Sequence, residues 1–339
     1  MAQAMAIDPD RAEAPDTPER AGEARRNGPF LVIANEASGT NARDGDAIRR
    51  AMAVLEDAGA RLRHWSPGDT DALNAILDEE IADGARTVVA AGGDGTAMAL
   101  ADAMVGRDAA MSVLPLGTFN YFARGLGLSE APEEAARTLL EAERRPIRVG
   151  EVNDQVFLNN ASLGIYPSIL KEREDVYRRF GRRRLMAHWS VVRTFWRFQR
   201  PMHLTLTLAD GERKEYRTPL LFVARSAYQL QRFNLAGCDA IQRDHLALLI
   251  GRGKSRAALF RLAWRLVTRS MQQGRDYDLV EAESVRVETA RRRPLLAFDG
   301  EKRRDTSPFD FAMTDQKLTI LLPPKDTDAS SEPGPESGT

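Results

Sequence analysis

The chain has 339 residues, of which 43% are hydrophobic and 29% are charged, and its formal net charge is −1. This composition is typical of a globular protein long enough for two domains, and the charge gives no global reason to expect nucleic acid as a partner. The single cysteine, Cys238, excludes an intrachain disulfide framework and fits a reducing cytoplasm. The four histidines show no ligand spacing, so a Cys/His metal site is not supported.

Both ends of the chain have the composition of disordered segments. Residues 1–27 are rich in Ala, Asp, Glu, Arg and Pro and lack the apolar core of a signal peptide, and residues 324–339 are rich in Pro, Ser, Asp, Glu and Gly. No apolar run approaches the roughly 20 residues that cross a bilayer. We therefore expect a disordered leader, a disordered tail, and a cytoplasmic protein that contacts the inner membrane face only peripherally.

The first part of the chain alternates strands with helices. The expected elements are a strand at 30–34, a helix after Asp46, a strand near 61–65, a helix near 70–82 and a strand from Val88. This alternation predicts a parallel sheet with helices on both faces. Ligands of such sheets bind at the carboxyl ends of the strands, where the turn from Asn35 to Thr40 and the turn at Gly92 fall.

The strand at 88–91 ends in the sequence Gly92, Gly93, Asp94, Gly95 and Thr96, which precedes a run of good helix formers. Glycine accepts φ > 0 and carries no Cβ, so a phosphate chain can approach the backbone N–H groups at the positive end of a helix. A tight turn without a ligand is the alternative. The carboxylate and the hydroxyl inside this turn suit Mg²⁺ or a phosphate-bound water, which favours a ligand.

A second glycine turn follows the strand near 111–116. Thr118 and Asn120 bring a hydroxyl and an amide to the edge of the sheet where Gly92 lies. Each turn taken alone has an equally good structural explanation. Three polar turns with glycine, in consecutive strand-to-helix positions, are better explained by a ligand.

After Pro146 the pattern changes to short strands. Asn153 and Asp154 indicate a hairpin, and further strands are expected near 203–208, 220–224, 246–250, 284–288, 295–298 and 317–322. The second half of the chain is therefore predicted to be mainly antiparallel β structure with two helical insertions.

The two insertions, 177–200 and 252–275, are basic and amphipathic and contain no acidic residue. A solvated basic face over a core-facing apolar stripe is the ordinary explanation of such helices. The interleaved Trp, Phe and Arg residues instead favour contact with an anionic membrane surface, with the rings at the level of the headgroups. Nucleic acid is disfavoured, because acidic residues elsewhere cancel a global basic field.

The strand at 295–298 ends in Asp299, Gly300 and Glu301. These residues suit a plain hairpin turn. Two carboxylates this close in sequence also suit a general base with a metal-binding or hydrogen-bonding neighbour.

Together these motifs resemble the diacylglycerol kinase catalytic-domain family, which comprises bacterial soluble lipid kinases related to sphingosine kinases and NAD kinases. The resemblance spans about residues 29–323, and the motifs that carry it are Gly92–Thr96, Leu114–Arg124, Phe157–Gly164 and Asp299–Glu301. It implies an ATP-binding α/β domain at 28–146, a β-sandwich domain for the lipid substrate at 147–314, and an active site between them. It also implies that a last strand at about 315–323 returns to the first domain.

The resemblance implies a role for each motif residue. ATP, with Mg²⁺, would contact Asn35, Ser38, Gly39, Gly92, Gly93, Asp94, Gly95, Thr96 and Thr118, and Asp94 would also bind the catalytic Mg²⁺. Asn120 and Arg124 would contact the substrate. Asp299 would be the proton acceptor, with Glu301 beside it.

The sequence departs from the family pattern at several positions. Gln242 and Arg243 stand in place of an acidic turn that holds a structural Mg²⁺ in some relatives, so we predict that this site is absent. Phe119 and Tyr121 stand where many members have a small residue and an aspartate, and Met98 follows the glycine turn in place of a polar residue.

The favoured function is ATP-dependent phosphorylation of a lipid hydroxyl, that of diacylglycerol or a related glycerolipid. Two alternatives stay open: a kinase of sphingoid bases or of a small molecule such as NAD, and a membrane-associated nucleotide-binding regulator without catalysis. A homodimer is also left open.

Overall fold

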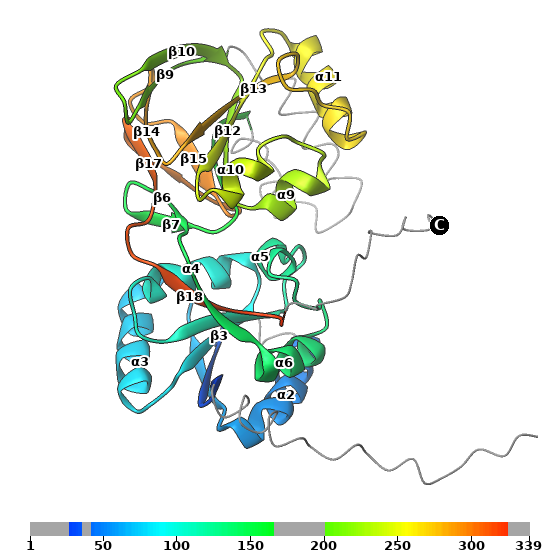
Figure 1. The fold of residues 1–339 in the computed structure, drawn as a ribbon, viewed down its shortest axis with the longest axis vertical. Helices are drawn as coiled ribbons and strands as arrows, with labels where there is room; N and C mark the ends of the chain where they lie inside the picture. The colour runs from blue at the N-terminus through cyan, green and yellow to red at the C-terminus, as the bar shows by residue number, and fades with distance from the viewer. Residues whose placement is uncertain (1–26, 36–41, 166–200, 325–339) are drawn as a thin grey trace, which may run out of the picture.

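The computed structural model describes residues 27–35, 42–165 and 201–324 (Figure 1). Ser38, Gly39 and the first basic insertion lie outside these ranges, as do the leader and the tail apart from Asn27 and Pro324. Asn27, which the sequence assigned to the leader, is buried, and its Nδ2 donates to Leu139 O at 3.3 Å and to Ala142 O at 2.7 Å. Asn27 is therefore part of the fold.

The first sheet is mostly parallel, as the alternation of strands and helices predicts. Its order is β2 (Arg61–Trp65), β1 (Phe30–Asn35), β3 (Thr87–Gly92), β4 (Ala110–Pro115), β18 (Leu318–Leu322) and β5 (Glu143–Ile147). Strands β1 to β4 pair in parallel, and only β5 runs antiparallel to its neighbour. The central strands are nearly continuous apolar runs because helices cover both faces of the sheet.

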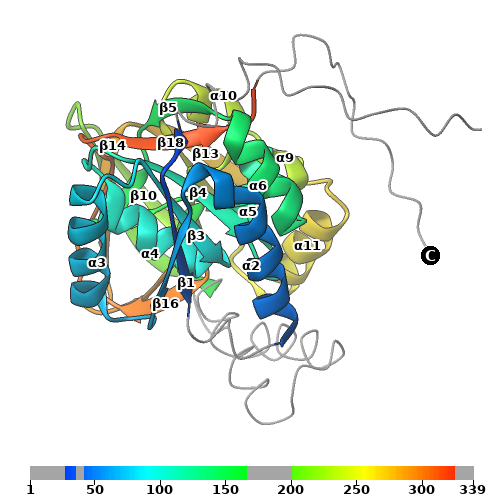
Figure 2. The same cartoon turned by 90° about the horizontal axis from the view of Figure 1, so that it is seen from below.

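Helices flank this sheet on both sides. Helices α2 (Ala42–Leu55) and α6 (Pro132–Glu141) pack together on one face, and α3 (Thr70–Ala82) and α4 (Asp94–Met104) pack on the other (Figure 2). A short helix, α5 (Tyr121–Gly125), follows β4, and a 3₁₀ turn, η1 (Glu56–Ala58), follows α2. The predicted doubly wound arrangement is confirmed.

The rest of the described chain forms two antiparallel sheets. One has the order β10 (Arg213–Thr218), β9 (Met202–Leu208), β14 (Ser284–Thr289), β17 (Phe309–Met313), β6 (Gly150–Val152) and β7 (Gln155–Phe157). The other has the order β13 (Tyr277–Ala282), β12 (Leu246–Gly251), β11 (Leu220–Ala224), β8 (Asn160–Gly164), β15 (Leu295–Phe298) and β16 (Glu301–Arg304). Leu206 and Phe311 of the first sheet share one buried cluster with Leu221 and Leu248 of the second. The predicted sandwich is confirmed.

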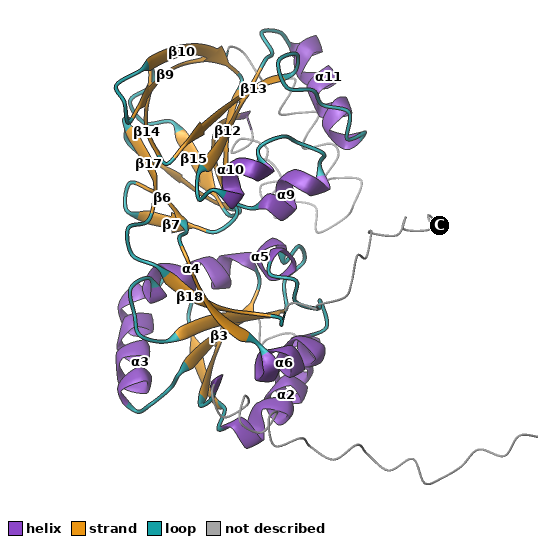
Figure 3. Ribbon diagram, viewed as in Figure 1, coloured by secondary structure: helices purple, strands orange, loops and turns teal. Residues whose placement is uncertain are grey.

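In the part of the chain that the structure describes, three helices accompany the sandwich: α9 (Ala227–Arg232), α10 (Cys238–Gln242) and α11 (Arg256–Val267) (Figure 3). The sequence predicted α11 but missed α9 and α10, which are too short to show a helical period. It also missed β10, β13, β16 and β17. Strand β10, with the sequence RKEYRT, is a half-exposed edge strand and therefore has no apolar run to reveal it.

Contacts between the α/β unit and the sandwich include those of α4 with β7 and those of α5 with α9. Between α4 and β7, Asp102 Oδ1 accepts a hydrogen bond from Val156 N at 3.1 Å. Between α5 and α9, the Arg124 guanidinium lies over the Tyr228 ring, 5.4 Å from its centroid. Because α4 and α5 directly follow the two glycine turns, these contacts hold the turns against the sandwich. No helix within the described ranges has both the length and the apolar character that crossing a bilayer requires.

Candidate active site

The polar turns meet at one edge of the first sheet. Ala34 pairs with Ala91 between β1 and β3, and Gly92 pairs with Pro115 between β3 and β4. The carboxyl ends of three neighbouring strands therefore lie side by side, which brings Asn35, Gly92 and the turn at Gly117 together, as the sequence predicts.

Two of the turns touch through their backbones. A Cβ on Gly117 would lie 2.6 Å from Gly93 Cα and 2.7 Å from Asn120 Oδ1, and a Cβ on Gly92 would lie 2.4 Å from Thr96 Oγ1. These distances are shorter than any normal contact, so the packing of the turns requires glycine at Gly92 and Gly117.

Gly95 has a different environment, because a Cβ at this position would collide with no other atom of the described chain. It lies in the first turn of α4, and the nearest atom to a Cβ built on it is Glu301 Oε1, at the ordinary distance of 3.5 Å. The space beside Gly95 borders backbone N–H groups of the first helical turn, which have no partner within the helix. We call the junction between the α/β unit and the sandwich, where Asp94 and Gly95 lie near Asp299 and Glu301, the cleft. An anion whose charge is balanced by a cation can approach this turn of α4 there.

Helix α4 begins earlier than the sequence suggests. Asp94 is its first residue, so the turn proper consists of Gly92 and Gly93, while Gly95 and Thr96 are already helical. Asp94 Oδ1 accepts a hydrogen bond from Phe122 N at 3.0 Å, which ties the second glycine turn to α4. Thr96 is buried against Gly92. A carboxylate at this position also interacts favourably with the positive end of the helix.

In the second glycine turn, Asn120 and Thr118 differ in what they contact. Asn120 is left-handed, with φ 48°, and its side chain closes the turn by accepting from Gly117 N at 2.9 Å and donating to Gly117 O at 3.0 Å. Thr118 is exposed. Asn120 therefore shapes the turn, whereas the Thr118 hydroxyl faces solvent.

Arg124, expected at the substrate, is engaged by protein groups on two sides. Its guanidinium forms an ion pair with Glu130 at 2.7 Å and covers the ring of Tyr228 in α9. Tyr121, on the same short helix, stacks on Phe119 with ring centroids 5.6 Å apart. Burial raises the pKa of Tyr121, so its phenol stays protonated.

Asp299 is the buried carboxylate of the cleft. The Asp299–Gly300 pair forms a two-residue turn between β15 and β16 with φ of 44° and 90°, so the hairpin alternative is also correct. The carboxylate turns inward, where Oδ2 accepts from Leu158 N at 2.5 Å and Oδ1 accepts from Asn159 N at 2.8 Å and Asn160 N at 3.0 Å. Asp299 is thus held by three backbone N–H groups.

The environment of Asp299 shifts its ionisation toward neutral pH. Burial raises its pKa to about 6, the three N–H groups oppose that rise, and the nearby charge of Asp94 adds to it. The carboxylate is therefore ionised at pH 7 and still basic enough to accept a proton. A pKa near the working pH is what general base catalysis needs.

Glu301 belongs to β16 of the sandwich, and its side chain extends toward the α/β unit. Its Oε1 is the atom nearest to the open side of Gly95, which belongs to the other structural unit. Asp94 and Glu301 therefore border the same turn of α4, one from each side of the cleft. Asp299 is close enough to Asp94 for their charges to interact.

Sequence reasoning missed the polar residues that surround Asp299. The segment Leu158–Asn160 belongs to one of the motifs that carry the family resemblance. It binds the Asp299 carboxylate through backbone N–H groups, which cannot be predicted from the types of its side chains. Asn160 Nδ2 donates to Gln229 Oε1 of α9 at 2.9 Å. Among the residues that the structure describes, the buried amide oxygens of Asn159 and Asn160 find no hydrogen-bond partner. Buried orphan oxygens indicate that a further polar group belongs beside them.

The two carboxylates beside Gly95 would hold Mg²⁺ together with phosphate oxygens rather than on their own. Within the described ranges, no group of three or more His, Cys, Asp or Glu side chains is placed to hold a metal. Mg²⁺ is commonly held by one or two carboxylates together with substrate phosphates. Asp94 and Glu301, beside the open turn of α4, match that requirement.

The turn after α10 does not suit a divalent cation. Asp244 is paired with Arg225 at 3.0 Å, and Arg243 is paired with Glu281. The carboxylate of this turn is thus already neutralised by a guanidinium, which agrees with the absence of acidic residues at Gln242 and Arg243.

Comparison with known proteins identifies relatives of the first part of the chain. Residues 29–152 match the family model of the diacylglycerol kinase catalytic domain. A "Probable lipid kinase YegS-like" of Pseudomonas aeruginosa is 43% identical over 140 residues, which are 40% of this chain and 43% of that protein. Another of Chromohalobacter salexigens is 33% identical over 187 residues, 52% of this chain and 57% of that protein. The chain thus spans about half the length of these curated relatives.

Solved structures share the whole fold at low sequence identity. A putative diacylglycerol kinase from Bacillus anthracis str. Sterne superposes with a TM-score of 0.64 at 18% identity, covering 87% of this chain and 97% of that one. A second structure, titled as a diacylglycerol kinase from the same organism, gives a TM-score of 0.64 at 19% identity. These matches establish the architecture of the α/β unit and the sandwich.

Proposed function

We propose that this chain, whose residues 29–152 match the family model of the diacylglycerol kinase catalytic domain, transfers the γ-phosphoryl group of ATP to the hydroxyl of diacylglycerol or a related glycerolipid. The observation that carries the proposal is the pairing of two features across one cleft. One is the open first turn of α4 at Gly95, and the other is Asp299, a buried carboxylate with a pKa of about 6. The first suits a phosphate chain and the second suits an alcohol that must lose a proton.

The first-domain side of the cleft would hold the nucleotide. Backbone N–H groups of the first turn of α4 would donate to phosphate oxygens, and the Thr118 hydroxyl lies exposed on the neighbouring turn. Asp94 and Glu301 would hold Mg²⁺, which when bound neutralises phosphate charge. Because phosphoryl transfer depends mostly on positioning and charge stabilisation, these contacts would supply much of the rate enhancement.

Asp299 would act on the lipid alcohol. The hydroxyl proton passes to its carboxylate as the alcohol oxygen bonds to the γ-phosphorus and the bond to the β-phosphate oxygen breaks. The three N–H donors at Leu158, Asn159 and Asn160 fix the carboxylate in place. A fixed base avoids the loss of side-chain freedom when the reaction occurs.

Helix α11 supplies the membrane contact that a lipid substrate requires. Its buried side contributes Leu259, whereas Phe260, Trp264 and Val267 are exposed by 39%, 70% and 76%. These three lie at i, i+4 and i+7, so they form one apolar stripe on the outside of the helix. The absence of acidic residues from 252 to 275 makes an anionic bilayer the complementary partner. Helices α11, α9 and α5 lie on the same side of the molecule (Figures 1 and 2).

The activity is tested by transfer of labelled γ-phosphate from ATP with Mg²⁺ to diacylglycerol, monoacylglycerol, sphingosine and NAD, each with and without anionic vesicles. We expect label in a glycerolipid and a faster rate with vesicles. Label in NAD with no vesicle effect would favour a soluble-substrate kinase. ATP binding without label in any acceptor would favour the regulator.

The membrane contact is tested separately by vesicle sedimentation. We expect Trp264→Ala to weaken binding to anionic vesicles by about 10- to 150-fold, because burying one large apolar side chain contributes about 1.5–3 kcal/mol. Leu62→Ala, which removes another exposed apolar side chain in β2, is the matched control. Equal binding by both variants would show that α11 does not reach the membrane.

A further inference from the structure

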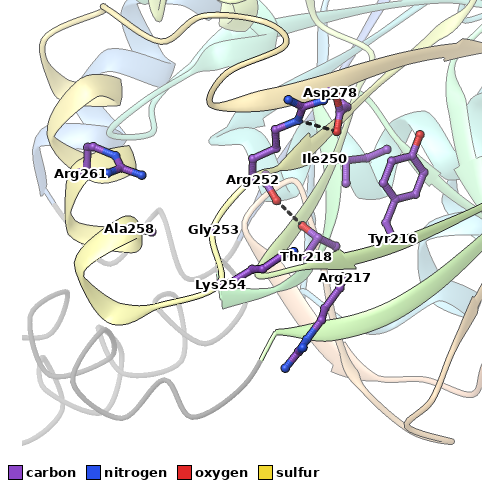
Figure 4. Close-up of a pocket in the computed structure, with 11 residues that line it drawn as sticks. Tyr216, Arg217, Thr218, Ile250, Arg252, Gly253, Lys254, Ala258, Arg261 and Asp278 are labelled. Atoms are coloured by element: carbon purple, nitrogen blue, oxygen red, sulfur yellow. Dashed lines mark hydrogen bonds and ion pairs between the residues drawn. The ribbon is translucent and has the colours of Figure 1, made fainter.

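A second concave site lies in the sandwich, built from residues that the cleft does not use. A cavity of about 450 Å³ opens between the end of β10, the end of β12, the start of α11 and β13 (Figure 4). Its lining comprises Tyr216, Arg217, Thr218, Ile250, Gly251, Arg252, Gly253, Lys254, Ala258, Arg261 and Asp278. The volume lies within the range of small-molecule sites, about 300–1,000 Å³.

The floor of this cavity is held by fixed interactions. Arg252 makes a bidentate ion pair with Asp278, Nε to Oδ2 at 2.9 Å and Nη2 to Oδ1 at 2.5 Å, and it also donates to Gly274 O. The buried Thr218 hydroxyl lies 2.8 Å from both Leu220 O and Gly251 O and shares its one hydrogen between these two acceptors. The shape of the cavity is therefore set before any ligand arrives.

The charges of the lining do not balance. Asp278 is its sole carboxylate, and Arg252 already neutralises it. Arg217, Lys254 and Arg261 remain, and no carboxylate of the described chain is within ion-pair distance of these three. Other exposed arginines of the same sheets do have acidic partners: Arg213 pairs with Glu288 and Arg286 pairs with Asp310. All three side chains are exposed, and Lys254 lies between Arg217 and Arg261 (Figure 4), so an anion that enters the cavity meets cations that no carboxylate of the described chain neutralises.

The donor set of the lining suits phosphate. Two guanidinium groups can each offer a planar fork to phosphate oxygens, and the Lys254 ammonium adds a compact charge. Burial raises the pKa of Tyr216, which keeps its hydroxyl protonated and able to donate. Ser255 caps the N-terminus of α11, where its side chain accepts a hydrogen bond from Ala258 N. Because Gly253 and Ala258 line the cavity, the positive end of the helix lies beside it.

We propose that this cavity binds a phosphate-bearing anion through Arg217, Lys254 and Arg261. The cavity and the cleft share no residues, so binding here does not depend on the kinase activity proposed above. The anion has two sources, a soluble phosphate or the headgroup of an anionic phospholipid. The exposed stripe at Trp264 lies on the helix that contributes Arg261, and a docked bilayer would bring headgroups to the same helix.

The test measures whether a bound anion protects Lys254, one of the residues that line the cavity. The acetylation rate of Lys254 is measured by mass spectrometry in the full chain, with and without inorganic phosphate at constant ionic strength. We expect phosphate at ten times its dissociation constant to slow acetylation of Lys254 by about tenfold. Lys317, exposed on the first domain, is the control within the same sample and should not slow.

A variant links the protection to the cavity. The double change Arg217→Gln and Arg261→Gln should abolish protection of Lys254, whereas Arg137→Gln and Arg291→Gln, with the same loss of charge on other exposed surfaces, should leave it intact. Protection that survives the first pair, or that extends equally to Lys317, would overturn the proposal.

Vesicles separate the two sources. If phosphatidylcholine vesicles with phosphatidylglycerol protect Lys254 more than phosphatidylcholine alone, and the cavity variant loses that difference, the anion is a lipid headgroup. If phosphate protects and the two kinds of vesicle do not differ, the anion is soluble. If neither phosphate nor anionic vesicles protect Lys254, the cavity does not bind phosphate.

Discussion

The two walls of the cleft differ in how they use side chains. The first-domain wall is made of turns at Gly92, Gly93 and Gly117 that pack backbone against backbone and leave the first turn of α4 open at Gly95. The second-domain wall does the reverse, since it buries the side chain of Asp299 among backbone N–H groups. One wall is shaped to admit a ligand and the other to hold one charged group.

The difference predicts how each wall responds to mutation. A new methyl group on the first wall changes shape and leaves ionisation alone, whereas a change at Asp299 alters ionisation and hydrogen bonding with little change in shape. Defects in nucleotide affinity should therefore come from the first wall, and defects in turnover from the second.

The largest expected effect is on turnover in Asp299→Asn. Loss of a general base typically costs 10²- to 10⁴-fold, so kcat should fall by about that factor. The affinity for ATP should change little, because the glycine turns are untouched. The check is a steady-state assay with the lipid acceptor together with a nucleotide-binding titration.

Near-normal kcat in Asp299→Asn would remove Asp299 from the role of base. The wild-type circular dichroism spectrum should persist in the variant, because asparagine is nearly isosteric and also tolerates the left-handed backbone at this position.

The next effect concerns stability, and its sign follows from the raised pKa of Asp299. The folded state holds this proton up to about pH 6, whereas an unfolded aspartate releases it near pH 3.8. The contribution of Asp299 to stability is therefore fully present below about pH 4 and is lost as the pH rises through 6. Because each unit of pKa shift corresponds to about 1.36 kcal/mol, the rise from 3.8 to about 6 makes this loss about 3 kcal/mol.

Denaturant unfolding of wild type and Asp299→Asn at pH 4, 5.5 and 7 measures this difference. Asparagine does not titrate, so its altered hydrogen bonds add a constant offset at every pH. The free energy of unfolding of wild type, relative to the variant, should fall between pH 4 and 7. A relative free energy that stays constant would show that the pKa of Asp299 is not raised.

The first wall is tested by a pair of glycine variants. In Gly95→Ala the new methyl group fits the fold and improves helix propensity by about 0.8–1 kcal/mol, so the protein should be slightly more stable. The methyl group enters the space assigned to phosphate, and the affinity for ATP should fall by about thirtyfold, from about 2 kcal/mol of overpacking.

Gly117→Ala is the matched control, because its methyl group would collide with Gly93 Cα and Asn120 Oδ1. It should lower the melting temperature. If Gly95→Ala keeps full affinity for ATP, the open turn of α4 does not hold the phosphates.

The sequence predicts the first wall better than the second. A glycine run after an apolar strand indicates the position and shape of a turn, so the meeting of Gly92 and Gly117 at one sheet edge could be expected. The polar side chains are harder to place. Asn120, which we expect at the substrate, also closes its own turn, and the Glu301 carboxylate, which we expect beside Asp299, also lies near Gly95.

The second wall depends on backbone contacts, which cannot be predicted from the types of the residues that make them. Backbone N–H groups of Leu158–Asn160 hold Asp299, and any residues except proline would offer the same donors. Helix α9, which brings Tyr228 and Gln229 to the cleft, has only six residues and no periodic pattern. The sequence could therefore suggest Asp299 as a base but not the burial that raises its pKa.

The smallest expected effect is the acidic limb of the pH–rate profile. A base must be ionised to accept a proton, so kcat/KM should fall about tenfold per pH unit below the pKa of Asp299, about 6. Because ATP itself titrates in this region, the residual activity of Asp299→Asn, measured across the same pH range, supplies the correction. After that correction the wild-type limb should have a midpoint near 6. A corrected rate that stays constant to pH 5 would mean that proton transfer to Asp299 does not limit the reaction, and the second wall would then act by positioning the alcohol.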